Sequence, residues 1–186
     1  YEESDLIAAL KFVSSYTAAP LSILLGVGTS YGDHNGNSVL ERYINRLTLR
    51  NNLSVTCAAG NEAIARHHYR GSFQSNSLEP VSVEFNVETQ MPGFLMQFHG
   101  SIPNRFSLLL RSPAGEEISN ISFDLDRSTT YTFIYSDTSL TIDSVISDPY
   151  SGEEAIYFNF KKPSIGIWQI LVTPLEIYTP GYFDFW

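Results

Sequence analysis

The hydrophobic periodicity of the chain changes at about residue 70, and this change limits the folds that the chain can adopt. Residues 81–87 alternate between apolar and polar side chains, with Phe85 among the valines and Glu84 among the polar residues. A period of two residues is typical of a strand with one buried face. Before residue 70 the apolar residues follow a helical spacing or form short continuous runs. We therefore expect two parts of different architecture.

The first part alternates between helix-like and strand-like segments. Apolar residues at helical spacing predict a helix over about residues 4–17, and Ser38 followed by Glu41 has the form of a capping box that begins a second helix. Apolar runs at residues 21–27 and 53–59 read as strands. The order helix, strand, helix, strand indicates a parallel α/β sheet, in which functional loops follow the carboxyl ends of the strands.

The second part consists of short apolar or alternating segments separated by turn residues. They cover residues 81–87, 94–98, 106–110, 131–135, 155–160 and 165–172. Roughly eight strands at this spacing, without a helical pattern, indicate an all-β jelly roll or β-sandwich. The expected domains are residues 1–70 and 71–186.

The charge distribution excludes some partners. Six Lys/Arg and six Asp/Glu lie before residue 71, whereas five and fourteen follow, so the net charge of -9 belongs to the second part. Such an acidic part repels phosphate backbones, so nucleic acid is not expected as a partner. No apolar run approaches the roughly 18 residues of a membrane span, and the acidic start at residues 1–5 is unlike a signal peptide. We therefore expect neither a membrane-spanning segment nor a signal peptide.

Several smaller patterns could carry chemistry, but each has a simpler explanation. The glycines of residues 26–32 nearly match a dinucleotide loop, although Tyr31 stands where the third glycine belongs. Cys57, the single cysteine, excludes an internal disulfide and is expected to be a buried, inert thiol. The acidic pairs could suggest a glycosidase but are most simply solvated; they are Glu116 with Glu117 and Glu153 with Glu154.

The four histidines do not form a metal-binding pattern. His67 and His68 are adjacent, so on a strand they point to opposite faces, and His34 and His99 have no ligand partner at a useful spacing. A structural or hydrogen-bonding role is therefore favoured for the His67–His68 pair.

Two strand ends carry a more specific pattern. Residues 23–29 read I-L-L-G-V-G-T, and residues 55–62 read V-T-C-A-A-G-N-E. Together they resemble two neighbouring strands of the subtilisin-like serine peptidases, the subtilase family. The resemblance implies that Asn61 donates into the oxyanion hole. It also implies a wall of the substrate pocket from Ala58, Ala59 and Gly60, and a strand that pairs with the peptide from Gly26, Val27 and Gly28. A plain strand followed by a turn is the alternative.

The subtilase catalytic motifs D-[ST]-G, H-G-T and G-T-S-M-A-x-P do not occur in this sequence. Gly28-Thr29-Ser30 imitates the last of them, but Tyr31-Gly32 follows where the family has Met-Ala. The resemblance thus implies an internal fragment of a serine endopeptidase, with the aspartate and histidine before Tyr1 and the serine after Trp186. We expect the fragment alone to be inactive.

The position of the second part resembles the clostridial Csp group of subtilases, which carry a jelly-roll insertion at this point and include proteases of spore germination. The run A-R-H-H-Y-R-G at residues 65–71 is similar to the sequence before that insertion. The resemblance implies a subtilase α/β parallel-sheet fragment followed by an all-β jelly-roll domain. It implies a peptide or protein substrate for the parent, a bacterial source with a spore or cell-envelope location, and no organic cofactor. It allows calcium in the parent, with no site identified here.

Two other functions are compatible with the same residues. The parent could be a pseudoprotease with a regulatory role, because the deciding residues are not in this sequence. Alternatively, the second part could be a non-catalytic module that binds carbohydrate or protein through aromatic residues near turns, namely Tyr150, Tyr178, Tyr182 and Trp186. Substrate specificity and oligomeric state are not indicated.

Overall fold

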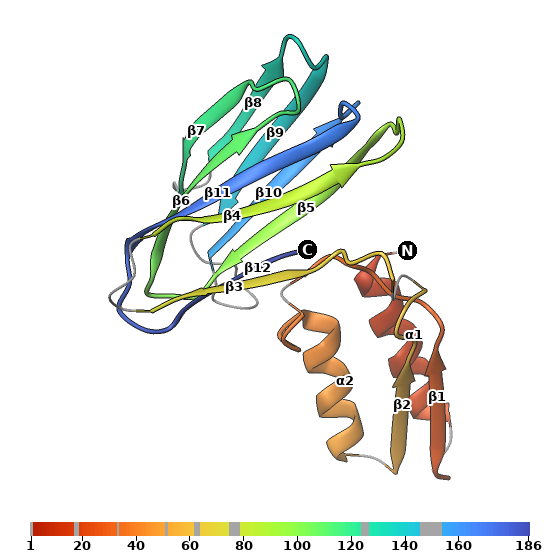
Figure 1. Cartoon of the computed structure of the whole chain (residues 1–186). Coiled ribbons are helices and arrows are strands. Elements are labelled where there is room, and N and C mark those ends of the chain that lie inside the picture. Colours follow the sequence, from red (N-terminus) through yellow and green to blue (C-terminus); the bar gives the residue numbers. More distant parts are fainter. Residues whose placement is uncertain are drawn as a thin grey trace. The chain divides into compact units, whose positions relative to one another are not determined.

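The chain divides into two compact units, Tyr1–Arg66 and His67–Trp186, in a computed structural model of the protein (Figure 1). The structure describes residues 2–16, 19–32, 34–50, 52–61, 64–74, 79–123, 127–145 and 154–186.

The first unit contains two helices and a small parallel sheet. Its elements are α1 (Glu3–Tyr16), β1 (Leu21–Leu25), α2 (Val39–Arg50) and β2 (Leu53–Cys57). β1 and β2 pair in parallel without a register shift, from Leu21 opposite Leu53 to Leu25 opposite Cys57. The order of these four elements is the one predicted from the sequence.

Side-chain capping fixes the start of α2. The backbone N–H of Glu41 donates to Ser38 Oγ at 3.2 Å, and the backbone N–H of Ser38 donates to Glu41 Oε2 at 3.0 Å, so the predicted capping box is confirmed. The Glu3 carboxylate accepts a further hydrogen bond from the Leu40 N–H at 2.6 Å, which joins the first turns of the two helices. Neither α1 nor α2, the helices of the described part, has the length and apolar character needed to cross a membrane.

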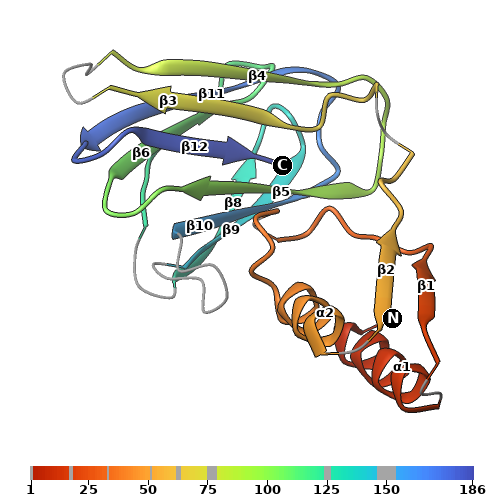
Figure 2. The same ribbon diagram turned by 90° about the horizontal axis from the view of Figure 1, so that it is seen from below.

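The second unit consists of two antiparallel sheets. The six-stranded sheet has the order β3-β12-β5-β10-β9-β8 (Figure 2). The four-stranded sheet has the order β4-β11-β6-β7 (Figure 1). The strands are β3 (Tyr69–Phe73), β4 (Val81–Val87), β5 (Gly93–Gly100), β6 (Arg105–Arg111), β7 (Glu117–Ile121), β8 (Arg127–Phe133), β9 (Thr138–Val145), β10 (Glu154–Lys161), β11 (Gly166–Glu176) and β12 (Gly181–Phe185).

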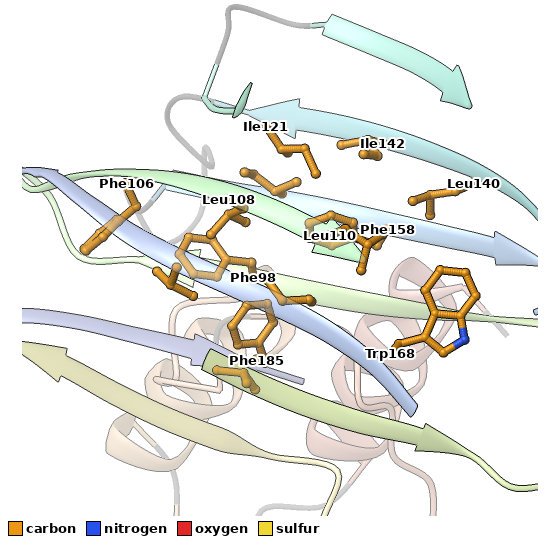
Figure 3. Close-up of a cluster of buried hydrophobic side chains, with 14 of the residues drawn as sticks. Phe98, Phe106, Leu108, Leu110, Ile121, Leu140, Ile142, Phe158, Trp168 and Phe185 are labelled. Atoms are coloured by element: carbon orange, nitrogen blue, oxygen red, sulfur yellow. The ribbon is translucent and has the colours of Figure 1, made fainter. Parts of the chain in front are cut away.

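The inner faces of the two sheets form an aromatic core (Figure 3). Trp168 on β11 is fully buried, and its ring stands edge-on to Phe133 and Phe160 of the opposite sheet. Its Nε1–H donates to the Ser164 carbonyl oxygen at 3.1 Å, so the buried indole keeps a hydrogen-bond partner. The apolar face predicted for residues 81–87 faces this core: Val83 and Val87 are buried in it, and Val81 and Phe85 pack against it.

The fold class predicted from the sequence, a subtilase α/β parallel-sheet fragment followed by an all-β jelly roll, is wrong for this chain. Parallel pairing is limited to β1 and β2, while all pairings found among the other ten strands of the described residues are antiparallel. The chain is therefore mainly an antiparallel β protein. The prediction gave too much weight to two apolar runs, because local periodicity does not reveal how many strands join a sheet.

Candidate functional site

The candidate site lies where β1 and β2 end next to each other. Leu25 and Cys57 are the last paired residues, and the Ala58 N–H donates to the Leu25 carbonyl oxygen at 2.9 Å, which extends the pairing by one residue. The two predicted segments therefore start side by side, with Gly26, Val27 and Gly28 after β1 and Ala58, Ala59, Gly60 and Asn61 after β2. All seven residues are exposed.

Gly60 turns the chain at the end of this extension. Its φ of 82° lies in the left-handed region that disfavours residues with a Cβ atom. No atom lies within 4 Å of the position that a Cβ would occupy, so backbone conformation rather than space explains the glycine. The turn ends the strand direction immediately before Asn61.

Asn61 presents an amide group that is not used within the described residues. Its side chain is exposed and makes no hydrogen bond to any residue that the structure describes. A primary amide carries two N–H donors and stays neutral at all pH values relevant to a protein. Asn61 can therefore donate to an anionic group of a ligand.

The backbone after β1 is also open in the described part of the chain. No backbone hydrogen bond joins Gly26, Val27 or Gly28 to another described residue. Unpaired N–H and C=O groups at a strand end can pair with an extended peptide, as in strand addition. The position next to β2 would place such a peptide beside the segment that carries Asn61.

The loop beyond Gly28 does not have the form of a dinucleotide site. Thr29 Oγ1 accepts a hydrogen bond from the Tyr31 N–H at 3.0 Å, and α2 begins only at Val39. A phosphate loop needs a helix directly behind its glycines. The contact between His34 Nε2 and Ser30 involves the Ser30 carbonyl oxygen, at 3.2 Å, which is no nucleophile.

Cys57, the last residue of β2, is exposed, so the expectation of a buried thiol is wrong. The apolar run around it suggested burial, but the structure covers only part of that strand's surface.

The second unit uses His68 in a structural cluster. His68 Nε2 lies 2.7 Å from Asp184 Oδ1, and its ring stacks on Trp186 with centroids 3.7 Å apart. The Arg70 guanidinium donates to Asp184 Oδ2 at 3.0 Å. The expected hydrogen-bonding role of His68 is thus present. No local pattern identifies Asp184 as its partner, because Asp184 lies 116 residues further along the chain. Within the described ranges, no group of three or more His, Cys, Asp or Glu side chains could hold a metal ion.

The acidic pairs are engaged rather than simply solvated. Glu116 accepts hydrogen bonds from the backbone N–H groups of Tyr135 and Ser136, and Glu117 pairs with Arg111 at 2.6 Å. Glu153 lies outside the described residues.

Two of the aromatic residues that could bind carbohydrate or protein are exposed, and each has a polar side chain close to it. Tyr178 donates its hydroxyl to Glu176 Oε2 at 3.1 Å, and this hydrogen bond is the main reason that the pKa of Tyr178 is raised. The Arg70 guanidinium lies 5.9 Å from the centre of the Tyr182 ring. Trp186 is partly covered by His68, and Tyr150 lies outside the described residues.

The fold of the chain is similar to that of a protease of known structure. No protein-family model and no curated protein matches the sequence. Among solved structures, the CspB protease of Clostridium perfringens matches over 100% of this chain, with a TM-score of 0.83 and 25% sequence identity. The match covers 40% of the CspB chain, so this chain spans less than half of the length of that protein. The similarity supports a protease-related chain.

Proposed function

We propose that this chain is a segment of a subtilisin-like serine endopeptidase in which Asn61 stabilises the oxyanion of the reaction. The observation that carries the proposal is the juxtaposition of the two strand ends, since the Ala58–Leu25 hydrogen bond holds them together and Asn61 follows with a free amide. The similarity to a protease over the whole chain supports it. The residue pattern V-T-C-A-A-G-N-E supplies the finer assignment to the subtilase type.

The proposed role follows from the chemistry of peptide-bond hydrolysis. Attack of a serine on the scissile carbonyl converts its oxygen into an oxyanion, which a preorganised N–H donor stabilises. One such donor typically lowers the barrier by about 3 to 4 kcal/mol. Asn61 is a neutral donor that follows the turn at Gly60, and its amide makes no hydrogen bond within the described residues, so it can meet the oxyanion without first being released from another partner.

The neighbouring residues would hold the substrate. The open backbone of Gly26, Val27 and Gly28 would pair with the extended peptide, and the small residues Ala58, Ala59 and Gly60 would leave room for the side chain before the cleaved bond. Because the aspartate, histidine and serine motifs do not occur in these 186 residues, those groups would come from elsewhere in the parent protein.

Asn61→Ala in the intact protease should lower kcat by about a hundredfold or more and leave KM nearly unchanged, because the amide meets charge only in the transition state. Steady-state kinetics on a peptide substrate measures both constants. Asn52→Ala is the matched control, since Asn52 is an exposed asparagine that precedes β2 at its opposite end. It should leave both constants within a factor of two.

An Asn61→Ala enzyme within threefold of the unchanged protein would contradict the oxyanion assignment. Asn61 would then be a turn residue only. An intact parent that cleaves no peptide would favour the pseudoprotease, and binding of carbohydrate or protein lost on Tyr182→Ala would favour a binding module.

A further inference from the structure

The segment between β1 and α2 contains the one Asn-Gly dipeptide of the sequence, Asn35-Gly36. Asparagine is a thermolabile residue, because the backbone nitrogen of the residue that follows it can attack its side-chain amide. A glycine in that following position has no side chain to hinder the attack. The sequence therefore makes Asn35 a candidate for loss of its amide, and the structure shows whether the fold protects it.

The folded chain leaves the reacting groups of this dipeptide accessible. The side chain of Asn35 is exposed, and the Gly36 N–H donates no hydrogen bond to a residue that the structure describes. No atom lies within 4 Å of the position that a Cβ of Gly36 would occupy, so there is space beside the backbone for a ring to form. Neither hydrogen bonding nor packing therefore holds the Gly36 nitrogen away from the amide.

Other exposed asparagines of the chain lack this combination. Asn86 is exposed on β4, but Val87 follows it, and the pairing of β4 with β11 holds both residues. Asn52 is exposed before β2, but Leu53 follows it and pairs with β1. A branched side chain and a backbone held in a sheet both oppose attack by the following nitrogen. These two residues are therefore internal controls for Asn35.

We propose that Asn35 is a site of spontaneous modification, at which the folded chain converts asparagine into aspartate and isoaspartate through a cyclic imide. A base takes the proton of the Gly36 N–H, and the nitrogen forms a bond to Asn35 Cγ. The bond from Cγ to Nδ2 breaks, and ammonia leaves with the proton. One water molecule then opens the imide, at Cγ to give aspartate or at the backbone carbonyl carbon to give isoaspartate. Nothing is oxidised or reduced, and water is the only co-reactant.

Either product changes the segment between β1 and α2. One negative charge is added to the net charge of -9. Isoaspartate also lengthens the backbone by one carbon, because the chain then runs through the side chain of the residue. The pairing of β1 with β2 and the capping box at Ser38 and Glu41 fix the two ends of the segment. The extra carbon must therefore change the conformation between them.

Incubation of the 186-residue chain at pH 8 and 37 °C, followed by peptide mapping with mass spectrometry, tests the proposal. Samples taken over several weeks should show loss of the Asn35 amide and two separable product peptides of equal mass, one with aspartate and one with isoaspartate. A synthetic peptide of residues 31–40 gives the rate without the fold, and the folded chain should react within tenfold of that rate. Asn52 and Asn86, measured in the same maps, should react at least tenfold more slowly than Asn35. Circular dichroism at each time point shows whether the chain stays folded.

Two variants check the chemistry. Asn35→Asp gives the reference position for the aspartate product. Gly36→Val should slow the loss of the Asn35 amide at least tenfold, because its branched side chain hinders the attacking nitrogen. Gly36 has a φ of 81°, at which a residue with a Cβ is strained, so the valine substitution is also made in the synthetic peptide, where the same decrease is expected.

Three outcomes would overturn the proposal. A folded chain that reacts more than tenfold more slowly than the peptide would show that the fold protects Asn35. Equal rates at Asn35, Asn52 and Asn86 would show that the Asn-Gly segment is not a special site. Aspartate formed without isoaspartate would show direct hydrolysis of the amide and no cyclic imide.

Discussion

Glu154 shows how a single buried oxygen makes the stability of the fold depend on pH. Its Oε2 atom is buried and has no hydrogen-bond partner among the described residues, and this burial raises the pKa of the Glu154 carboxyl above 4.5, although Arg105 acts in the opposite direction. A raised pKa means that the folded state holds the proton more tightly than the unfolded chain. The stabilisation that results is complete below the unfolded pKa and is lost as the pH rises through the folded pKa. At neutral pH the ionised carboxylate therefore lowers the stability of the folded state.

The side chain of glutamine cannot ionise. Glu154→Gln should therefore melt at a higher temperature than the unchanged chain at pH 7, and this difference should shrink toward pH 4. Thermal melts at both pH values measure this. Glu84→Gln is the control on an exposed strand position and should show no comparable gain. A Glu154→Gln variant that is less stable at pH 7 would show that the Arg105 attraction outweighs burial.

At the same scale, a functional residue can be predicted from the sequence when its role depends on the residues directly next to it in the chain. Asn61 stands out because Gly60 precedes it and an apolar run ends there. Asp184 cannot be found in this way, because its partners His68 and Arg70 are brought to it by the pairing of β12 with β3. The exposure of Cys57 also depends on what covers a strand, which no local pattern contains.

At the scale of the element, Gly71 on β3 is required by the strand beside it. Gly71 pairs with Phe183 on β12, and a Cβ atom at residue 71 would overlap the Phe183 ring. That ring is fully buried and packs on Phe73 and Phe98 at centroid distances of 5.5 and 5.8 Å, so it has no room to move. Gly71→Ala should therefore destabilise the second unit by about 1–3 kcal/mol. A thermal melt of the chain, followed by near-ultraviolet circular dichroism of the core aromatics, measures the loss. Ser72→Ala, an exposed change on the same strand, should stay within about 0.5 kcal/mol of the unchanged chain. Equal melting of the two variants would show that the core accepts a methyl group at residue 71.

Elements were predictable where their signals are local. The capping box at Ser38 and Glu41 acts within one helical turn, and the alternation of β4 is complete within seven residues. β7 was missed because it offers only Ile118 and Ile121 as apolar residues and contains a left-handed Asn120. The strand order was beyond reach for another reason: β11 lies between β4 and β6, so its partners are far away along the chain.

At the scale of the whole molecule, the two units differ in the number of hydrophobic side chains that they bury. The second unit has a continuous aromatic and aliphatic core, whereas Leu10 and Leu47 are the buried hydrophobic residues found in the described part of the first unit. Leu24 and Ile64 are 74% and 94% exposed there. A two-stranded sheet is marginal by itself. We therefore expect residues 67–186 to fold alone with a cooperative thermal transition and residues 1–66 not to do so. Melts of the two separately expressed pieces measure this, and a cooperative transition in residues 1–66 would contradict the expectation.

The pairing of Tyr69 with Phe185 has a consequence for how such a unit is inherited. Because the first and last strands of the sandwich are neighbours, and His68 stacks on Trp186 at the same end, the two ends of the segment leave it at one point. In the subtilase parent that we propose, gain or loss of a segment whose two ends lie together would change one loop and leave the spacing of the parent's other strands as it was.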